Sequence, residues 1–237
     1  MVGPLYSVCL MSILTAHEFG HYFAAKYHRV PASLPYFIPF PSLLGTMGAV
    51  IRMSGAIPNR RALFDIAAAG PIAGLVVALP VSFVGLYLSD HVTSNSQGMV
   101  VLGDPLLLQA MQWLIHGPLP DNVDLMLHPV AFAGWVGLFV TALNLLPIGQ
   151  LDGGHINHAL FGRHSQRVAL AAFVVLAVMT FMYGYHYTLI LFLLLFMGVK
   201  HPPTMNDFLE LGPVRRRIGF GLWIVFALCF TPAPLKF

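Results

Sequence analysis

Apolar segments of about twenty residues recur along the chain, and they limit its fold more than any other feature. Six are present, at about 3–26, 63–88, 128–147, 167–184, 185–200 and 217–232. A helix of about 20 residues spans the roughly 30 Å hydrocarbon core of a bilayer. Only 9% of the 237 residues are charged, whereas soluble domains carry about 25%. We therefore expect an all-α polytopic membrane protein with six transmembrane helices, forming a single domain over 1–237.

The segment between the first two apolar runs predicts strands rather than helix. It reads "PYFIPFPSLLGTMGAVIRM" and spans residues 35–53. Prolines disfavour a helix at its start, and the alternating β-branched residues that follow are typical of strands. Because these residues are apolar, we expect a short re-entrant β-hairpin that dips into the membrane and is covered by protein.

The distribution of charge predicts the orientation. If the first segment runs from outside to inside, all basic residues except Lys236 fall on the inner side: Lys26, Arg29, Arg52, Arg60, Arg61, Arg163, Arg167, Lys200, Arg215, Arg216 and Arg217. This agrees with the positive-inside rule and places both termini outside. Bases at the ends of apolar segments indicate the lipid bilayer, and not nucleic acid, as the partner. We expect the first segment to be retained, because Glu18 and its neighbouring histidines do not suit the apolar core of a signal peptide.

Ionisable residues lie inside the first apolar segment. His17, Glu18 and His21 form an H-E-x-x-H pattern. On a helix, two histidines four residues apart share a face and can bind one Zn²⁺, with the glutamate beside a metal-bound water. An ionisable residue within a membrane helix is a functional hypothesis by default, because burying it is costly. The alternative is a polar cluster satisfied by hydrogen bonds between helices.

A third zinc ligand is predicted from the stretch "NLLPIGQLDGGHIN", residues 144–157. A catalytic zinc site has three protein ligands and one open position. The first and third segments run in the same direction, so their inner ends meet at similar depth. Asp152 is the stronger candidate there, and His155, three residues later, is its competitor. In the second segment, Gly70 and Gly74 form a G-x-x-x-G pattern that favours close packing with another helix.

These motifs together resemble the site-2 proteases, which are intramembrane zinc metalloproteases. The resemblance rests on H-E-F-G-H, N-L-L-P-I-G-Q-L-D-G-G, "GTMGAVIRM", "NRRALFDIAAAGPIAG", "KHPP" and "GPVRRRIGFGLWIVFALCFTPAPL", and covers nearly the whole chain. It implies core catalytic helices at about 3–26, 63–88 and 128–147, with the other three peripheral. The outer loop is too short for the PDZ domain that many members carry.

The resemblance also implies roles for individual residues. His17, His21 and Asp152 would bind one Zn²⁺ per chain, and Glu18 would be the acid/base that activates zinc-bound water. Asn144 would hold the substrate backbone or the developing oxyanion. The strand containing Gly45 and Gly48 would pair with an unwound substrate by β-addition.

The expected function is zinc-dependent endopeptidase cleavage of a transmembrane segment in a single-pass protein. Such a substrate is, for example, a membrane-tethered transcription regulator or an anti-sigma factor. We expect a multi-pass protein of the bacterial cell membrane or a plastid membrane, with its active site toward the cytoplasmic side. One alternative is a polytopic metal-ion transporter that uses intramembrane His and Asp residues, and another is an inactive relative that serves as a scaffold.

Overall fold

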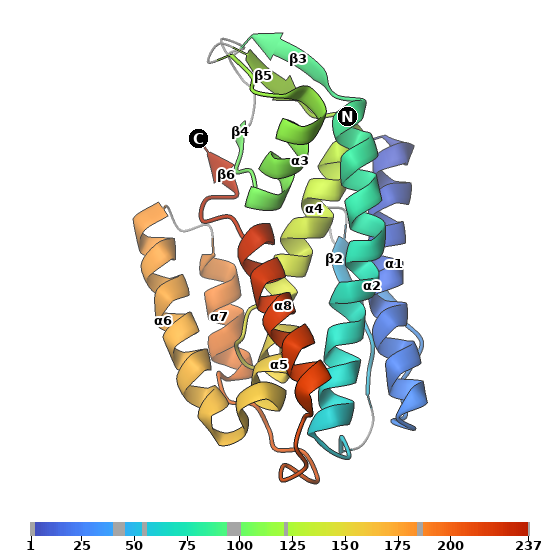
Figure 1. The fold of residues 1–237 in the computed structure, drawn as a ribbon, viewed down its shortest axis with the longest axis vertical. Helices are drawn as coiled ribbons and strands as arrows, with labels where there is room; N and C mark the ends of the chain where they lie inside the picture. Colours follow the sequence, from blue (N-terminus) through green and yellow to red (C-terminus); the bar gives the residue numbers. More distant parts are fainter. Residues whose placement is uncertain are drawn as a thin grey trace.

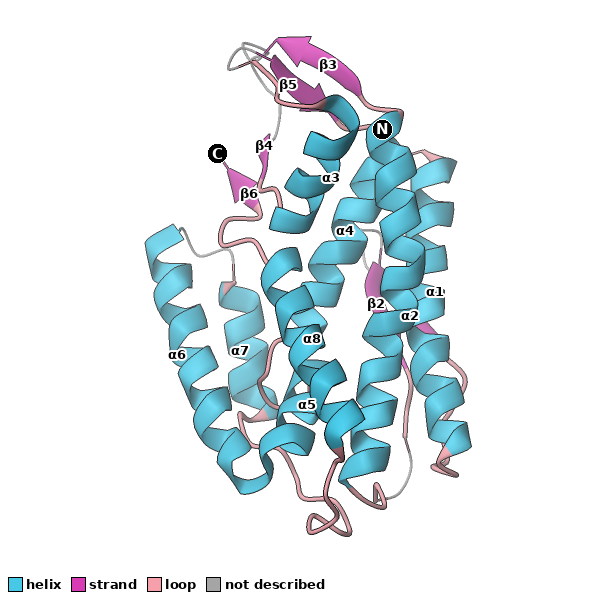
Figure 2. Cartoon of the chain, in the orientation of Figure 1, coloured by secondary structure: helices cyan, strands magenta, loops and turns pink. Residues whose placement is uncertain are grey.

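The computed structural model describes residues 3–39, 46–53, 56–93, 101–120, 123–183 and 187–236, and within them it is mostly helical (Figures 1 and 2). The helices are α1 (Pro4–Tyr27), α2 (Arg60–Tyr87), α3 (Leu106–His116), α4 (Pro129–Asn144), α5 (Asp152–Phe161), α6 (Ser165–Tyr183), α7 (Thr188–Met197) and α8 (Pro213–Cys229). By length and composition, two stretches of the described residues are able to cross a membrane: Arg60–Tyr87, and Asp152–Tyr183, in which α5 and α6 are joined by a short 3-10 turn. Pro129–Asn144 is a shorter apolar helix.

Each predicted apolar segment coincides with a helix, but helix α5 was not predicted. After α4 ends at Asn144, the chain turns and starts again as α5 at Asp152. A helix was not expected here because the segment contains Gly153 and Gly154, and glycine is a poor helix former. Their missing side chains are required by packing, since a Cβ on Gly153 would overlap the Leu145 carbonyl.

A hairpin of strands is present where the sequence predicted one. Strand β1 (Tyr36–Pro39) pairs antiparallel with β2 (Thr46–Val50), and an isolated bridge joins Ala32 to Met53 beyond them. Gly48 lies in β2, whereas Gly45 lies outside the described residues. That the hairpin enters a membrane stays a prediction.

Short strands near α3 add to the mostly helical fold and are not part of the all-α expectation (Figure 2). Strand β3 (Asp90–Thr93) pairs with β5 (Val123–Met126), and β4 (Val101–Leu102) pairs with β6 (Leu235–Lys236). These strands are not predicted from the apolar segments because each is only two to four residues long and forms by pairing with residues distant in the chain. The amphipathic α3 lies beside them (Figure 1).

Helices α1, α2 and α4 pack closely through small residues. A Cβ on Gly20 of α1 would overlap the backbone of Ala69 on α2, so the two backbones are in contact. Gly70 and Gly74 also face α1, which confirms the predicted packing role of the G-x-x-x-G pattern. The site described below lies at this contact.

Polar contacts join the helices at one end of the bundle. Asp65 of α2 accepts two hydrogen bonds from Arg215 of α8, at 2.7 and 2.9 Å, and its Oδ2 lies 2.9 Å from His28 Nε2 after α1. Arg60 donates to the carbonyls of Ala159 and Leu160, which are free at the carboxyl end of α5. These contacts connect α1, α2, α5 and α8 at the end of the bundle that carries the basic residues.

Candidate metal centre

The H-E-x-x-H residues lie on the buried face of α1. His17 is only 4% exposed and Glu18 8%. The two imidazoles are one helical turn apart, with their Nε2 atoms separated by 3.1 Å. The helical spacing predicted from the sequence therefore brings both rings to the same place.

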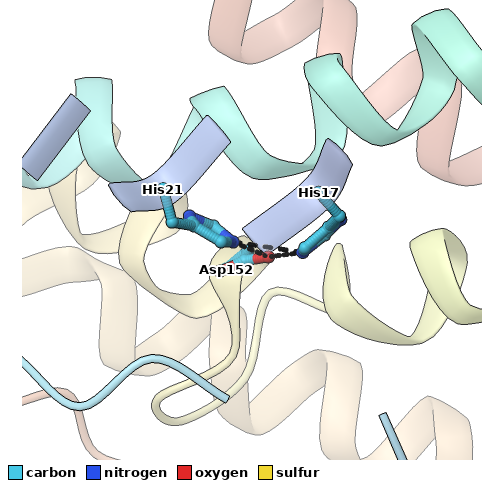
Figure 3. Close-up of side chains that lie close together, drawn as sticks. All are labelled: His17, His21 and Asp152. Carbon is cyan, nitrogen blue, oxygen red and sulfur yellow. Dashed lines mark hydrogen bonds and ion pairs between the residues drawn. The ribbon is translucent and has the colours of Figure 1, made fainter. Parts of the chain in front are cut away.

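Asp152 approaches these rings from the start of α5 (Figure 3). Its Oδ2 lies 3.2 Å from His17 Nε2 and 3.2 Å from His21 Nε2. The break between α4 and α5 makes this approach possible, because it returns the chain toward α1 before helix α5 begins. Within the described residues these three side chains are the one group of His, Cys, Asp or Glu with metal-binding spacing.

The spacing of the three donor atoms fits zinc. In a tetrahedral zinc site with metal–ligand bonds of about 2.0–2.1 Å, neighbouring ligand atoms lie about 3.3–3.4 Å apart. The observed separations of 3.1–3.2 Å are close to this value. Two imidazoles and one carboxylate also form a donor set used by catalytic zinc sites, with one position left for water or substrate.

Helix α2 holds His21 in the orientation that metal binding needs. The Nδ1–H of His21 donates to the Ile66 carbonyl oxygen at 2.7 Å, so Nε2 is the nitrogen that faces Asp152 and is available to a metal. The ring lies against Gly70, where a Cβ would overlap it, whereas a Cβ at Gly74 would lie 3.2 Å from His17 Nδ1. This role could not be predicted from the sequence, because it depends on how α1 and α2 align.

A cavity of about 240 Å³ adjoins the cluster. Besides the three candidate ligands, its lining includes Glu18, Asn144 and His155, together with the apolar Ile51 and Met53 that follow β2. Asn144 Nδ2 lies 3.3 Å from His17 Nε2, so Asn144 is at the site as predicted.

His155 lines the cavity but does not join the three clustered side chains. Its Nδ1 contacts His201 Nε2. Of the two candidates for third ligand, the structure brings Asp152 and not His155 to the H-E-x-x-H histidines. His201 was missed at the sequence level, although its segment "KHPP" contributed to the resemblance.

Two histidines one turn apart, a glutamate after the first, and a carboxylate from a later helix together define the metallopeptidase class of site. Comparison with known families agrees. Residues 5–185, about three quarters of the chain, match the profile described as Peptidase family M50. The chain belongs to this family, the site-2 proteases, which confirms the resemblance.

The chain is similar to several curated plant proteins. The chain is 31% identical over 223 residues to "Probable zinc metalloprotease EGY1, chloroplastic" of Arabidopsis thaliana, covering 91% of this chain and 40% of that protein. It is 35% identical over 164 residues to the EGY1 protein of Oryza sativa subsp. japonica, covering 65% and 27%. It is 31% identical over 182 residues to "Probable zinc metalloprotease EGY2, chloroplastic" of Oryza sativa subsp. indica, covering 74% and 33%. The chain thus spans well under half the length of these relatives. Their names and the donor set both support zinc as the metal.

Proposed function

We propose that the chain is a zinc-dependent intramembrane endopeptidase that cleaves a transmembrane segment of a single-pass membrane protein. One observation carries the proposal: His17, His21 and Asp152 converge, with Glu18 buried beside them, in a cavity between apolar helices. Membership of family M50 and the relatives' names support the metalloprotease part.

The outer helices support a membrane setting. On α6 and α7, large apolar side chains are exposed, such as Val174 at 52%, Phe192 at 67% and Phe196 at 85%. Exposed apolar surface of this extent is unfavourable in water and suits contact with lipid. We infer six membrane crossings with the basic end of the bundle inside. The metal site then lies nearer the inner face, where water reaches it.

Hydrolysis requires a proton acceptor, a proton donor and a stabilised carbonyl oxygen. When bound, zinc supplies Lewis acidity that polarises a carbonyl and makes water a stronger acid. Glu18 takes a proton from the attacking water as the new C–O bond forms. As the C–N bond breaks, Glu18 returns this proton to the leaving amine. Asn144 donates from Nδ2 to the carbonyl oxygen that gains charge.

The substrate helix must unwind before its peptide bond can enter the cavity, because helical hydrogen bonds protect that bond. We infer that β2, which contains Gly48 and is preceded by Gly45, pairs with the unwound segment as an added strand. The chain leaves β2 directly into Ile51 and Met53 of the cavity lining. A strand added to β2 therefore leads toward the metal site. Single-pass regulators and anti-sigma factors suit this route because one helix can enter sideways.

The alternatives have less support. A metal-ion transporter needs ligands but no glutamate beside them, and membership of a peptidase family does not support it. An inactive scaffold has no use for an intact Glu18.

Replacing Glu18 by Gln tests the proposal. The variant should keep one zinc per chain and lose cleavage of a co-expressed single-pass substrate, because the amide cannot accept the proton. Glu210→Gln is the matched control, since Glu210 is the chain's other glutamate and is exposed in the loop before α8. Cleavage that survives Glu18→Gln would refute the mechanism. Zinc uptake into vesicles by the purified chain, lost in His17→Ala, would favour the transporter.

A further inference from the structure

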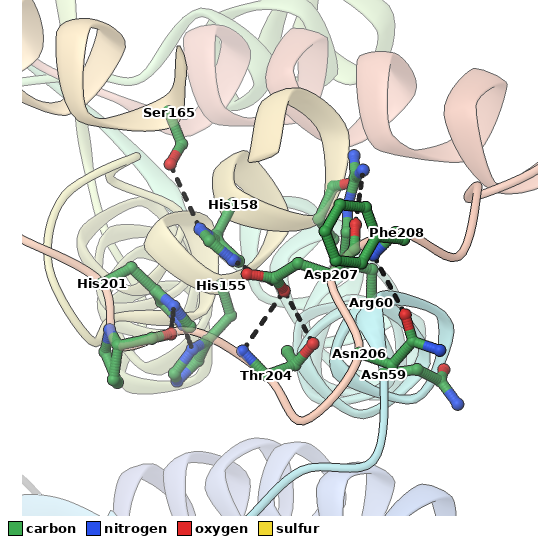
Figure 4. A network of polar contacts seen from close by, with 12 residues as sticks. Asn59, Arg60, His155, His158, Ser165, His201, Thr204, Asn206, Asp207 and Phe208 are labelled. Atoms are coloured by element: carbon green, nitrogen blue, oxygen red, sulfur yellow. Dashed lines mark hydrogen bonds and ion pairs between the residues drawn. The ribbon is translucent and has the colours of Figure 1, made fainter. Parts of the chain in front are cut away.

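A contact between two histidines joins the cavity to the loop that connects α7 and α8. His155 of α5 lines the cavity, and its Nδ1 is hydrogen-bonded to Nε2 of His201 in that loop (Figure 4). The proposed mechanism uses neither residue. The direction of the hydrogen bond decides what His155 can do in the cavity.

The other nitrogen of His201 fixes this direction. His201 Nδ1 contacts the Pro202 carbonyl oxygen, which can only accept, so Nδ1 carries a proton. Burial, together with the nearby His155 and His158, lowers the pKa of His201 to about 3, and its ring is therefore neutral at neutral pH. A neutral imidazole has one N–H. His201 Nε2 is thus an acceptor, and His155 Nδ1 is the donor to it.

The ring of His201 is held from its other side (Figure 4). It stacks on His158, with ring centroids 4.5 Å apart and an interplanar angle of 14°. His158 lies 3.3 Å from both Ser165 Oγ and Asp207 Oδ1. Asp207 in turn accepts from the Thr204 hydroxyl at 2.7 Å. These contacts keep His201 in position to accept from His155.

His155 Nε2 is then an unprotonated acceptor. Within the described part of the chain it has no hydrogen-bond partner. The other strong acceptors of the cavity have partners or roles already: Asp152 contacts both histidines of α1, and Glu18 serves the water. An unwound peptide brings N–H groups into this cavity, and a buried N–H without an acceptor is costly.

We propose that His155 binds the unwound substrate by accepting a hydrogen bond from a backbone N–H at Nε2, and that His201 is the positioning residue that fixes its tautomer. This proposal rests on the proposed function. It gives the two sides of the substrate backbone different partners: Asn144 donates to a carbonyl, and His155 accepts from an amide.

Two amide substitutions separate this role from a structural one. His155→Gln places an amide near the position of Nε2, whereas His155→Asn places one near Nδ1 and can keep only the contact with His201. We expect His155→Asn to raise KM and lower kcat/KM by roughly tenfold to a hundredfold, as for a lost partner of a buried donor. His155→Gln should recover most of this loss. If His155→Asn kept kcat/KM and His155→Gln lost it, the contact with His201 would be structural, and the proposal would be overturned.

A second measurement does not depend on cleavage. In zinc-loaded protein with ¹⁵N-labelled histidine, solid-state NMR should show His155 as the Nδ1–H tautomer, identified by the signals that His155→Gln removes. In His201→Phe the acceptor is lost, and His155 should shift toward the Nε2–H form. An Nε2–H tautomer in the unsubstituted protein would overturn the proposal, as would loss of zinc from His155→Gln. If the unsubstituted protein cleaves no substrate, the proposed function is refuted. The NMR measurement of the His155 tautomer does not depend on cleavage and still tests where the ring carries its proton.

Discussion

A single methyl group added at Gly70 should disable the metal site. Gly70 of α2 faces the His21 imidazole, and the Cβ of an alanine there would lie 2.5 Å from His21 Cδ2 and closer still to Nε2 and Cε1. Carbon atoms pack at about 3.5–4.0 Å, so the ring must move by about 1 Å or more. That movement breaks the 2.7 Å hydrogen bond to Ile66 and the 3.2 Å approach of Nε2 to Asp152.

The expected loss for Gly70→Ala follows from this displacement. Changing a group that merely orients a ligand typically weakens metal binding by about 10- to 100-fold. Here the ligand itself is displaced, so we expect zinc affinity to fall by at least about 100-fold and cleavage to be lost. Overpacking should also cost about 1–3 kcal/mol of stability.

Gly74→Ala is the matched control, one helical turn away on the same face. Its Cβ would lie 3.2 Å from His17 Nδ1, so a shift of a few tenths of an ångström suffices. Both variants are purified in detergent, checked for helical content, and titrated with a zinc chelator while bound metal is measured. Gly74→Ala should lose less than about tenfold. If Gly70→Ala holds zinc as tightly as the unsubstituted protein, α2 does not position His21 and the packing argument is refuted.

Two further predictions concern the basic end of the bundle. Burial alone would raise the pKa of Asp207, but hydrogen bonds from Thr204 and His158 hold that pKa below its ordinary value. The ionised carboxylate therefore stabilises the folded state at neutral pH, and this stabilisation is lost as the pH falls below about 4. Thermal unfolding of Asp207→Asn should therefore depend less on pH between about 5 and 3, and an unchanged acid slope would contradict this. Asp65→Asn removes the carboxylate that Arg215 contacts twice, and should lower stability by about 1 kcal/mol at low salt; an equal loss in high salt would show that charge is not the cause.

The sequence predicted the features that depend on local spacing. His17, Glu18 and His21 share a face because they are close together on one helix, and Asp152 followed from the depth at which two helices end. Helix α5 was missed because Gly153 and Gly154 resemble a loop, although close packing against the carbonyls of Leu145 and Gly149 requires them.

Features that depend on how helices align could not be predicted. The Ile66 carbonyl and the space beside Gly70 serve His21 only because α1 and α2 meet in one register. His201 reaches His155 from a loop 46 residues later in the chain. The β3–β5 and β4–β6 strand pairs likewise depend on distant partners. Whether the β1–β2 hairpin enters the membrane stays a prediction.

The separation of the site residues along the chain has a consequence for biogenesis. In the proposed topology, α1 is made before α2 and α4 and carries His17, Glu18 and His21 into the membrane before their partners on those later helices exist. The Ile66 carbonyl becomes available with α2, so insertion of α1 and α2 as a pair costs less than insertion of α1 alone. The carboxylate of Asp152 follows only after α4 has been made. Although its first residues leave the ribosome early, the metal site is completed late, and newly made protein is therefore inactive until most of the bundle has assembled.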